Sequence, residues 1–319
     1  VPRVLAGELD VVMLSGNPGD GKTSLLVQLG QELMASPGST VLLQDDAGWA
    51  IQREGRTFHA VFDASESHGE LTSDALVKRA LEPVRSRKNG PATALIAIND
   101  GRLHQFFEDN SDTYEDWWFE IQDQLSGKDV GESRIVLIDL KRRALASAVG
   151  DALADRTLAS LVRTDLWDSC SSCAARELCP ILSNRNTLAG EGASAFGELM
   201  LISHLRRRRR ATFRDVRSAA AWLITGDRDC PDVHKLVQEG KDPRLMPDAL
   251  THDLAFVTDS NDYLVDEWSD IDPAMVPSPA VDRVRRLAFS SEGVLSFRSA
   301  AGAARAIYFG DPSYRGVER

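Results

Sequence analysis

The sequence predicts an α/β protein: a parallel sheet with helical crossovers, followed by a helical domain that carries a cysteine cluster. Three observations predict this fold class. A glycine-rich loop pattern near the start of the 319-residue chain lies between an apolar run and a helical stretch. Short apolar runs then alternate with helical patterns through the first 140 residues, as in sheets whose parallel strands are joined by helices. After about residue 150 helical patterns dominate, and three of the four cysteines lie between positions 170 and 179.

The glycine-rich loop reads SGNPGDGKTS at residues 15–24 and has the pattern Gly16-x4-Gly21-Lys22-Thr23. Glycines let the backbone curl so that successive N–H groups point at an anion, and the helix that begins there adds the positive end of its dipole. Lys22 can reach the β- and γ-phosphates, and the hydroxyl of Thr23 can hold Mg²⁺. The pattern therefore predicts a P-loop that binds ATP with Mg²⁺. The residues expected to contact the nucleotide are Gly16, Asn17, Pro18, Gly19, Asp20, Gly21, Lys22, Thr23 and Ser24.

Five apolar runs predict the strands of the sheet, and each is short and continuous, as expected of a parallel strand buried on both faces. In order along the chain, the expected strands are residues 11–15, 40–46, 58–65, 93–100 and 134–140. The expected helices of this half are residues 23–34, 73–84 and 113–125. Residues 1–150 are therefore expected to form a P-loop core.

The second half is expected to contain two further parts. Residues 151–255 are predicted to form a helical, lid-like domain with the cysteine cluster. The amphipathic helices expected in it are residues 151–163, 192–207 and 212–225. Residues 256–319, acidic and punctuated by prolines at first, are predicted to form a C-terminal extension with a helix at 280–289.

Charge and hydropathy narrow the function classes. The net charge of −11 argues against general coating of nucleic acid but leaves room for a local basic patch. No stretch approaches 18 apolar residues, and the first residues lack the pattern of a secretory signal. We therefore expect a soluble, cytoplasmic protein without a membrane span. In that compartment clustered cysteines are more often metal ligands than disulfides.

Hydrolysis by a P-loop protein requires an acid at a neighbouring strand end and a group that orients water. Asp63 follows the apolar lead-in HAVF, 41 residues after Lys22, and could position Mg²⁺ through water. Glu66 could polarise the attacking water. Asn99, at the end of the next strand, could contact the γ-phosphate or that water. We therefore expect Lys22, Asp63, Glu66 and Asn99 to be catalytic.

Other strand-end acids compete with Asp63 for this role. Asp100 makes LIAIND a rival acidic strand, and the pair Asp45-Asp46 ends the run TVLLQDD. Any of these acids would also serve to cap the turn or helix that follows, which is the usual role of such residues. The order of P-loop strand, acidic strand and asparagine strand resembles the AAA+ class of P-loop ATPases. Under that resemblance Asn99 is the first sensor.

Cys170, Cys173 and Cys179 form a C-x2-C-x5-C pattern. Two thiolates of a C-x2-C segment can chelate one metal ion, and a third nearby makes a tripod. A tetrahedral, thiolate-rich site suits structural Zn²⁺, and the spacing is also compatible with an iron–sulfur cluster. The third interpretation is a set of buried thiols without metal. The candidates for a fourth ligand are Cys230, which is preferred, His234 and His204.

The arginine run Arg206–Arg210 is the densest basic segment of the chain. An arginine could reach the γ-phosphate, in cis or from the neighbouring subunit of a homo-oligomer. The run could also bind a DNA backbone, or form a solvated basic helix end that the helix dipole favours. We expect nucleotide contact from one of Arg209, Arg210 or Arg214, and Thr212 as the N-cap of the next helix.

Taken in order, these segments resemble the ATPase component of bacterial DNA-phosphorothioation-dependent restriction systems. The segments are GNPGDGKT, VFDASES, LIAINDGRLHQF, IVLIDLKRR, CSSCAARELCP and ATFRDVRSAAAWLITG. They span about residues 10–230, and their order together with the cysteine cluster makes the resemblance. It implies an intracellular ATPase that works with partner proteins to defend the cell against foreign DNA.

Two other functions remain open. A P-loop kinase of a small molecule needs an acceptor pocket and a short lid, and a cysteine-bearing helical domain is not expected there. A nucleotide-binding scaffold would keep the loop but hydrolyse ATP slowly or not at all.

Overall fold

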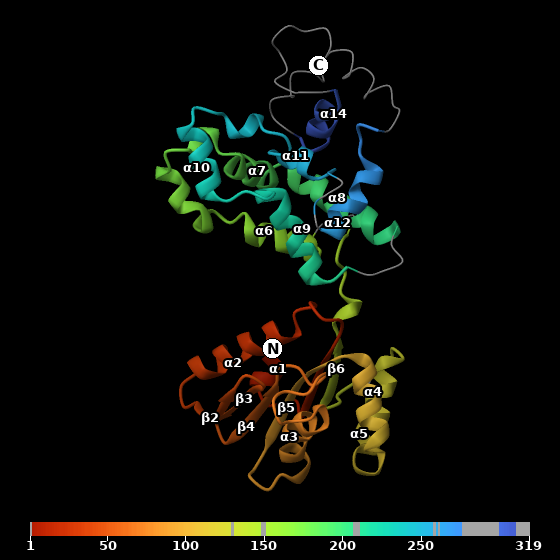
Figure 1. The fold of residues 1–319 in the computed structure, drawn as a ribbon. Helices are drawn as coiled ribbons and strands as arrows, with labels where there is room; N and C mark the ends of the chain where they lie inside the picture. Colours follow the sequence, from red (N-terminus) through yellow and green to blue (C-terminus); the bar gives the residue numbers. More distant parts are fainter. Residues whose placement is uncertain are drawn as a thin grey trace. The chain divides into compact units, whose positions relative to one another are not determined.

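The chain divides into two compact units, Val1–Arg143 and Ala144–Arg319, called here the N-terminal and the C-terminal unit (Figure 1). The computed structural model describes residues 2–128, 131–147, 151–206, 211–257, 260, 262–275 and 300–310. None of the described helices combines the length and the apolar character needed to cross a membrane.

The N-terminal unit is built on a six-stranded sheet with the spatial order β2-β3-β4-β5-β1-β6. The strands are β1 (Val11–Ser15), β2 (Thr40–Asp45), β3 (Gly48–Arg53), β4 (Arg56–Val61), β5 (Ala92–Ile98) and β6 (Ile135–Asp139). The strands β4, β5, β1 and β6 run parallel to one another, whereas β3 is antiparallel to both β2 and β4. The fold is thus α/β, and all five strands expected from the apolar runs are present.

The prediction of a wholly parallel sheet is wrong at one end of the sheet, where β3 was not expected. A two-residue turn, Glu54-Gly55, joins β3 to β4, and both of its residues have positive φ (50° and 77°), as a tight hairpin requires. The hairpin makes β2 an edge strand. Its apolar residues Val41, Leu42 and Leu43 are 45%, 54% and 41% exposed, so this run is not buried on both faces.

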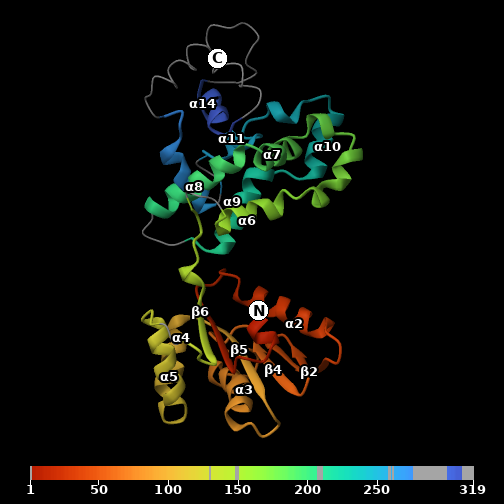
Figure 2. The same cartoon turned by 180° about the vertical axis from the view of Figure 1, so that it is seen from behind.

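Helices cover both faces of the parallel strands (Figure 2). Side chains of β1 alternate between the two faces: Val12 and Leu14 pack with α2, whereas Val11 and Met13 belong to the cluster formed with the other helices. This two-sided burial explains the continuous apolar run of β1. The helices of this unit are α1 (Pro2–Leu5), α2 (Lys22–Ala35), α3 (Ser73–Ser86), α4 (Asp100–Asp109), α5 (Ser111–Leu125) and the short η1 (Leu140–Arg142).

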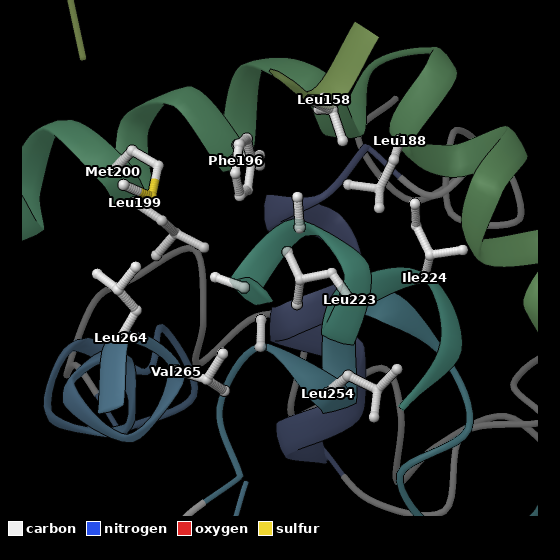
Figure 3. Close-up of a cluster of buried hydrophobic side chains, with 14 of the residues drawn as sticks. Leu158, Leu188, Phe196, Leu199, Met200, Leu223, Ile224, Leu254, Leu264 and Val265 are labelled. Carbon is white, nitrogen blue, oxygen red and sulfur yellow. The ribbon is translucent and has the colours of Figure 1, made fainter. Parts of the chain in front are cut away.

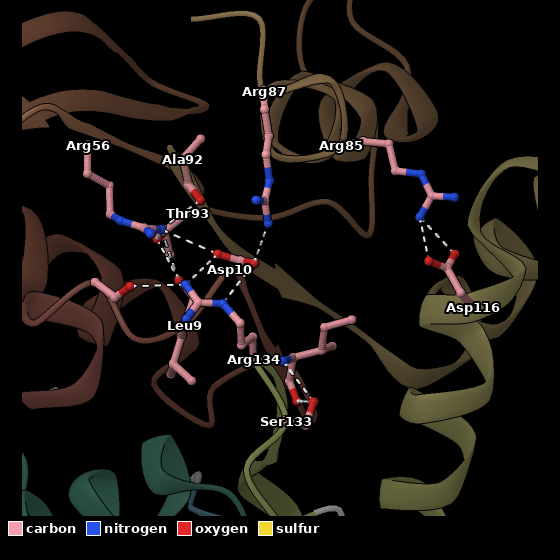
Figure 4. Close-up of polar contacts among 12 residues, drawn as sticks. Leu9, Asp10, Arg56, Arg85, Arg87, Ala92, Thr93, Asp116, Ser133 and Arg134 are labelled. Atoms are coloured by element: carbon pink, nitrogen blue, oxygen red, sulfur yellow. Dashed lines mark hydrogen bonds and ion pairs between the residues drawn. The ribbon is translucent and has the colours of Figure 1, made fainter. Parts of the chain in front are cut away.

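A network of ion pairs lies at the amino edge of the sheet, where the parallel strands begin (Figure 4). The carboxylate of Asp10 accepts hydrogen bonds from Arg134 at 2.9 and 3.0 Å, from Arg87 at 3.2 Å and from Arg56 at 3.4 Å. Burial disfavours the charge of Asp10, but these arginines outweigh that effect and hold its pKa below the usual value. Arg56 also donates to the hydroxyl of Thr93 at 2.9 Å.

The C-terminal unit is helical in its described parts and has its own apolar core (Figure 3). Leu158, Phe196 and Leu223 pack in that core, from α6, α8 and α9. The elements are α6 (Leu153–Leu161), η2 (Thr164–Ser172), η3 (Arg176–Leu178), α7 (Pro180–Ala189), α8 (Gly192–Arg206), α9 (Phe213–Thr225), α10 (Cys230–Gln238), η4 (Pro243–Leu245), α11 (Thr251–Leu254), α12 (Tyr263–Trp268), η5 (Ser269–Ile271) and α14 (Ala300–Tyr308).

The helices expected at 151–163, 192–207 and 212–225 correspond to α6, α8 and α9. The expected cap is confirmed, because the hydroxyl of Thr212 accepts a hydrogen bond from the backbone of Asp215. The helix expected at 280–289 lies outside the described residues.

Candidate functional site

The glycine-rich loop connects the carboxyl end of β1 to the first residue of α2, Lys22. Gly19 and Gly21 have φ values of 93° and 89°, in the left-handed region that glycine adopts without strain. A Cβ added to Gly16 would lie 2.8 Å from a carboxylate oxygen of Asp20 and 3.3 Å from Cβ of Leu140. The sequence therefore places glycine where the backbone must turn or must approach its neighbours closely.

Lys22 is buried within this loop. Its ammonium group donates to the carbonyl oxygens of Gly16 at 2.7 Å and of Asn17 at 3.0 Å, so the side chain folds back over the loop. Burial lowers the pKa of Lys22, and the negative charges of Asp63 and Asp20 oppose that shift. A cation is thus held at the centre of the loop.

One backbone N–H group of the loop binds an anionic group within the chain. The amide of Asn17 donates to the carboxylate of Asp20 at 2.7 Å. A carboxylate oxygen and a phosphate oxygen accept the same kind of charge-assisted hydrogen bond. The loop is therefore chemically suited to phosphate at this donor.

Thr23 connects the loop to the end of β4. Its hydroxyl donates to the carbonyl oxygen of Phe62 at 2.9 Å, directly before Asp63. The carboxylate of Asp63 accepts the backbone N–H of Ser65 at 2.9 Å, and Asp63 is exposed. The hydroxyl of Thr23 thus lies against the residue before Asp63, and both residues carry oxygen ligands of the kind that Mg²⁺ favours.

Asn99 lies at the end of β5, between the strands that lead to Asp63 and to the loop. Its backbone N–H donates to the hydroxyl of Ser65 at 2.8 Å, which ties the segment after β4 to the end of β5. The carbonyl oxygen of its side chain caps α4 by accepting the backbone N–H of Arg102 at 2.8 Å. Glu66 is exposed in the same segment as Asp63.

The rival acids lie in ion pairs of their own. Asp100 pairs with Lys141, from η1, and Asp45 pairs with Arg79 of α3 at 2.8 Å. Asp46 is exposed beside Asp45. The negative charge of Asp63, in contrast, acts on Lys22 and opposes the lowering of its pKa by burial.

Two buried polar atoms at the carboxyl ends of the parallel strands have no hydrogen-bond partner within the described chain. They are the hydroxyl oxygen of Ser15, the last residue of β1, and one carboxylate oxygen of Asp100. In the sheet register Ser15 lies between Ile98 of β5 and Asp139 of β6. A polar ligand in the loop would lie next to the end of this strand.

The predicted arginines belong to the C-terminal unit. Arg206 ends α8, and Arg214 is exposed in the first turn of α9. Arg209 and Arg210 lie outside the described residues. Contact of Arg210 or Arg214 with the nucleotide stays a prediction.

All four cysteines are free thiols of the C-terminal unit. Burial raises the pKa of Cys179, and the neighbouring thiols of Cys230 and Cys170 raise it further, while backbone N–H groups after Cys179 oppose the shift. The sulfur of Cys173 lies 3.3 Å from Nε2 of His234. No described group of three or more histidine, cysteine, aspartate or glutamate side chains has the arrangement of a metal site.

Sequence reasoning missed Ser65 and Lys141 at the carboxyl edge of the sheet. Ser65 lies two residues after Asp63 in the segment DASES. The carboxylate of an aspartate can accept the backbone N–H of the residue two positions later, an arrangement called an Asx turn, and Asp63 does so here. Lys141 lies in DLKRR directly after β6, but its pairing with Asp100 spans 41 residues and has no local signal.

In comparisons with known proteins, no protein-family model, curated protein or solved structure matches the chain.

Proposed function

We propose that the N-terminal unit binds Mg-ATP in the loop of residues 16–24 and hydrolyses it. The observation that carries the proposal is the position of Lys22, which is buried in the glycine-rich loop, donates to two of its carbonyl oxygens and lies within the electrostatic reach of Asp63. In this proposal the loop amides and Lys22 bind the β- and γ-phosphates, which replace the carbonyl oxygens of Gly16 and Asn17 as partners of the ammonium group.

Mg²⁺ would be held by the hydroxyl of Thr23 and, through water, by Asp63. The 2.9 Å hydrogen bond from Thr23 to Phe62 supports this pairing, because it holds the Thr23 hydroxyl against the backbone of the residue before Asp63. When bound, the ion would offset the negative charge that develops on the phosphate oxygens during transfer. Asn99 would contact the γ-phosphate or the lytic water, and Glu66 would polarise that water.

Asp63 is favoured over Asp100 and Asp45 for this role. Asp100 and Asp45 are each engaged by a cation from another element, Lys141 and Arg79. A carboxylate that neutralises a neighbouring cation is a poorer ligand for a metal ion, since binding the ion would break the pair.

The wider role rests on the resemblance to the ATPase component of phosphorothioation-dependent restriction systems. We propose that ATP hydrolysis acts as a motor or switch in such an anti-phage complex, in the bacterial cytoplasm and together with other proteins of the system. DNA contact, where it occurs, would use Arg206–Arg210, and a homo-oligomer would allow an arginine to reach a neighbouring nucleotide.

A second candidate is a nucleotide-binding scaffold that hydrolyses ATP slowly. One observation favours it: Asp63 and Asn99 each use a side-chain oxygen to cap the backbone that follows. Turnover measured with and without DNA and partner proteins separates the two candidates. Turnover that DNA or partner proteins accelerate supports the ATPase, and slow or absent phosphate release under all of these conditions supports the scaffold.

Calorimetric titration with Mg-ATP tests the site. We expect Lys22→Ala to weaken ATP binding about 100-fold, because an ammonium–phosphate contact and its hydrogen bonds are lost. Lys88→Ala is the matched control, since Lys88 is an exposed lysine of the same unit, after α3, and should leave the affinity unchanged. Equal affinity in wild type and Lys22→Ala would remove the loop from nucleotide binding.

A charge-reversal variant tests the arginine run. Changing Arg206, Arg207 and Arg208 to Glu spares Arg209, Arg210 and Arg214, the nucleotide candidates. If the run binds DNA, the variant should bind DNA more weakly and with a flatter salt dependence, because fewer counterions are released. Unchanged DNA binding, partner binding and ATP turnover would leave a solvated helix end as the role of these three arginines.

A further inference from the structure

A cavity of about 680 Å³ lies in the N-terminal unit, on the face of the sheet that α3 covers. Its lining comes from strands β2 to β5, from α3 and the turn after it, and from the start of α5. Cavities that bind small molecules measure about 300–1,000 Å³. The glycine-rich loop follows β1, which β5 separates from β4 in the sheet, and no residue of that loop lines the cavity. The cavity is therefore distinct from the candidate nucleotide site.

The floor of the cavity is polar, although the same face of the sheet is apolar elsewhere. Side chains alternate along a strand, so Thr57, His59 and Val61 of β4 share one face. Val61 packs in the apolar cluster with α3, whereas Thr57 and His59 line the cavity. Gln52 of β3 pairs with Thr57 in the sheet and also lines it. Three polar side chains thus lie side by side beneath α3.

These groups and one tyrosine form no side-chain hydrogen bond with any described residue. Thr57 and Tyr114 are only 8% and 2% exposed, and both line the cavity. The hydroxyls of Thr57 and Tyr114, the imidazole of His59 and the carboxamide of Gln52 have no partner within the described chain. Buried polar groups cost free energy unless a partner satisfies them. Four hydrogen-bonding groups are therefore available to a ligand in one cavity.

All four groups are uncharged at neutral pH. Burial lowers the pKa of His59, and the positive charge of Arg79 lowers it further, so the imidazole is neutral. Burial raises the pKa of Tyr114, the charge of Glu82 raises it further, and Arg85 opposes the shift. A carboxamide, a neutral imidazole and two hydroxyls can each donate and accept hydrogen bonds.

The charged residues of the lining largely balance one another. Arg79 pairs with Asp45 at 2.8 Å. Arg85 pairs with Asp116 at 2.7 Å (Figure 4). The remaining charged residues of the lining are one lysine and one glutamate, which are exposed and opposite in sign. The cavity therefore has no strong preference for an anion or a cation, and its hydrogen-bonding groups select the ligand.

We propose that this cavity binds an uncharged nucleobase, free or as its nucleoside, between the sheet and α3. The edge of a nucleobase carries both donors and acceptors, which the four neutral groups can match. Leu42 and Pro83 also line the cavity and supply apolar surface for the faces of a planar ring. The proposal does not depend on ATP binding in the glycine-rich loop, because the two places share no residue.

Equilibrium dialysis of the full chain with adenosine, guanosine, cytidine and uridine, each up to about 1 mM, tests the proposal. We expect saturable binding of at least one nucleoside and no comparable binding of ribose. Lys22→Ala should bind that nucleoside as the wild type does, whether or not it binds ATP. Binding of none of the four, ribose bound as tightly as the nucleoside, or loss of binding in Lys22→Ala would overturn the proposal.

The charge of the ligand is tested in Lys22→Ala, where the glycine-rich loop is impaired. The 5′-monophosphate of the bound nucleoside should bind no more tightly than the nucleoside itself. Tighter binding of the monophosphate would overturn the assignment of an uncharged ligand.

Substitutions in the cavity test the contacts. Tyr114→Phe and Thr57→Val each remove one hydroxyl, and Gln52→Ala removes the carboxamide. Each should weaken nucleoside binding about three- to tenfold, the effect of losing one hydrogen bond. Gln44→Ala is the matched control, since Gln44 is exposed on β2 outside the cavity, and it should bind as the wild type does. Unchanged affinity in all three cavity variants would overturn the site.

A measurement on the wild-type chain keeps the proposal testable if a variant fails to fold. The bound nucleoside should slow hydrogen exchange in β3, β4 and the start of α5 and leave the C-terminal unit unchanged. Slowing confined to the glycine-rich loop or to the C-terminal unit would overturn the location of the site.

Discussion

The two edges of the N-terminal sheet differ in how completely their polar groups are paired. At the amino edge, Asp10 accepts hydrogen bonds from Arg56, Arg87 and Arg134, and the buried hydroxyl of Thr93 donates to the carbonyl oxygen of Leu9 at 2.7 Å. This network joins the beginnings of strands that are distant in sequence. We therefore expect this network to stabilise the folded N-terminal unit.

The carboxyl edge is paired less completely. The hydrogen-bond partners of buried Lys22 are two backbone carbonyl oxygens, and the buried hydroxyl of Ser15 has no partner in the described chain. Buried polar groups without good partners cost free energy, and proteins retain them where a ligand or a reaction requires them. The contrast suggests a division of roles within one sheet: the fold itself pairs the polar groups of the amino edge, whereas the carboxyl edge keeps buried polar groups that the proposed nucleotide would engage.

The largest effect is expected at the carboxyl edge, in Asp63→Asn. This change should lower ATP turnover by about 10- to 100-fold with little loss of ATP affinity, because it alters the metal and its water rather than the phosphate loop. Steady-state phosphate release and calorimetric titration measure the two quantities. Asp100→Asn is the control, and a loss of turnover there with wild-type behaviour of Asp63→Asn would make Asp100 the catalytic acid.

A smaller effect is expected at the amino edge, in Asp10→Asn. The change leaves three arginines without their carboxylate and should lower the unfolding free energy of the N-terminal unit by about 2 kcal/mol. ATP affinity should stay unchanged. Hydrogen exchange of β1 and β5 amides reports this unit separately from the other. Unchanged exchange would show that the network contributes no stability.

The contribution of Asp10 should depend on pH in a defined direction. Its pKa is lowered in the folded protein, so the stabilisation is present above about pH 4 and is lost as the pH falls through the folded pKa. The difference in stability between wild type and Asp10→Asn should therefore be full at neutral pH and shrink in acid. A difference that stays constant down to pH 2 would assign the effect to packing rather than to charge.

The smallest effects come from two buried hydroxyls, one at each edge. Thr93→Val removes a donor to Leu9 and an acceptor for Arg56, and should cost about 1 kcal/mol. Ser15→Ala removes a hydroxyl that has no partner among the described residues and should be neutral or stabilising by up to about 1 kcal/mol. Denaturant titration of the two variants measures both changes. Equal losses would erase the distinction between the edges.

Much of this fold follows from local sequence signals. The run VVMLS coincides with β1 because both faces of that strand are buried, and Thr212 caps α9 as its position before an amphipathic stretch indicates. Strand β3 was missed because its six residues include Gly48 and end in polar side chains. The turn Glu54-Gly55 was the available signal for it.

The candidate site also has a part that local sequence predicts and a part that it does not. The loop of residues 16–24 is visible in the sequence because its chemistry is contiguous. The choice among the strand-end acids is not, since it depends on contacts between distant segments. Asp100 is engaged by Lys141, 41 residues later, and Asp45 by Arg79, 34 residues later. No local pattern encodes such pairs, whereas folding brings them together.

The most direct test of the central claim is the unfolding free energy of the N-terminal unit with and without Mg-ATP, measured by hydrogen exchange of β1 and α2. At a nucleotide concentration about 100-fold above Kd, binding should stabilise the wild-type unit by about 2.7 kcal/mol. Lys22→Ala should gain little under the same conditions. No stabilisation of the wild type, or an equal gain in both proteins, would contradict a nucleotide site at the carboxyl edge of this sheet.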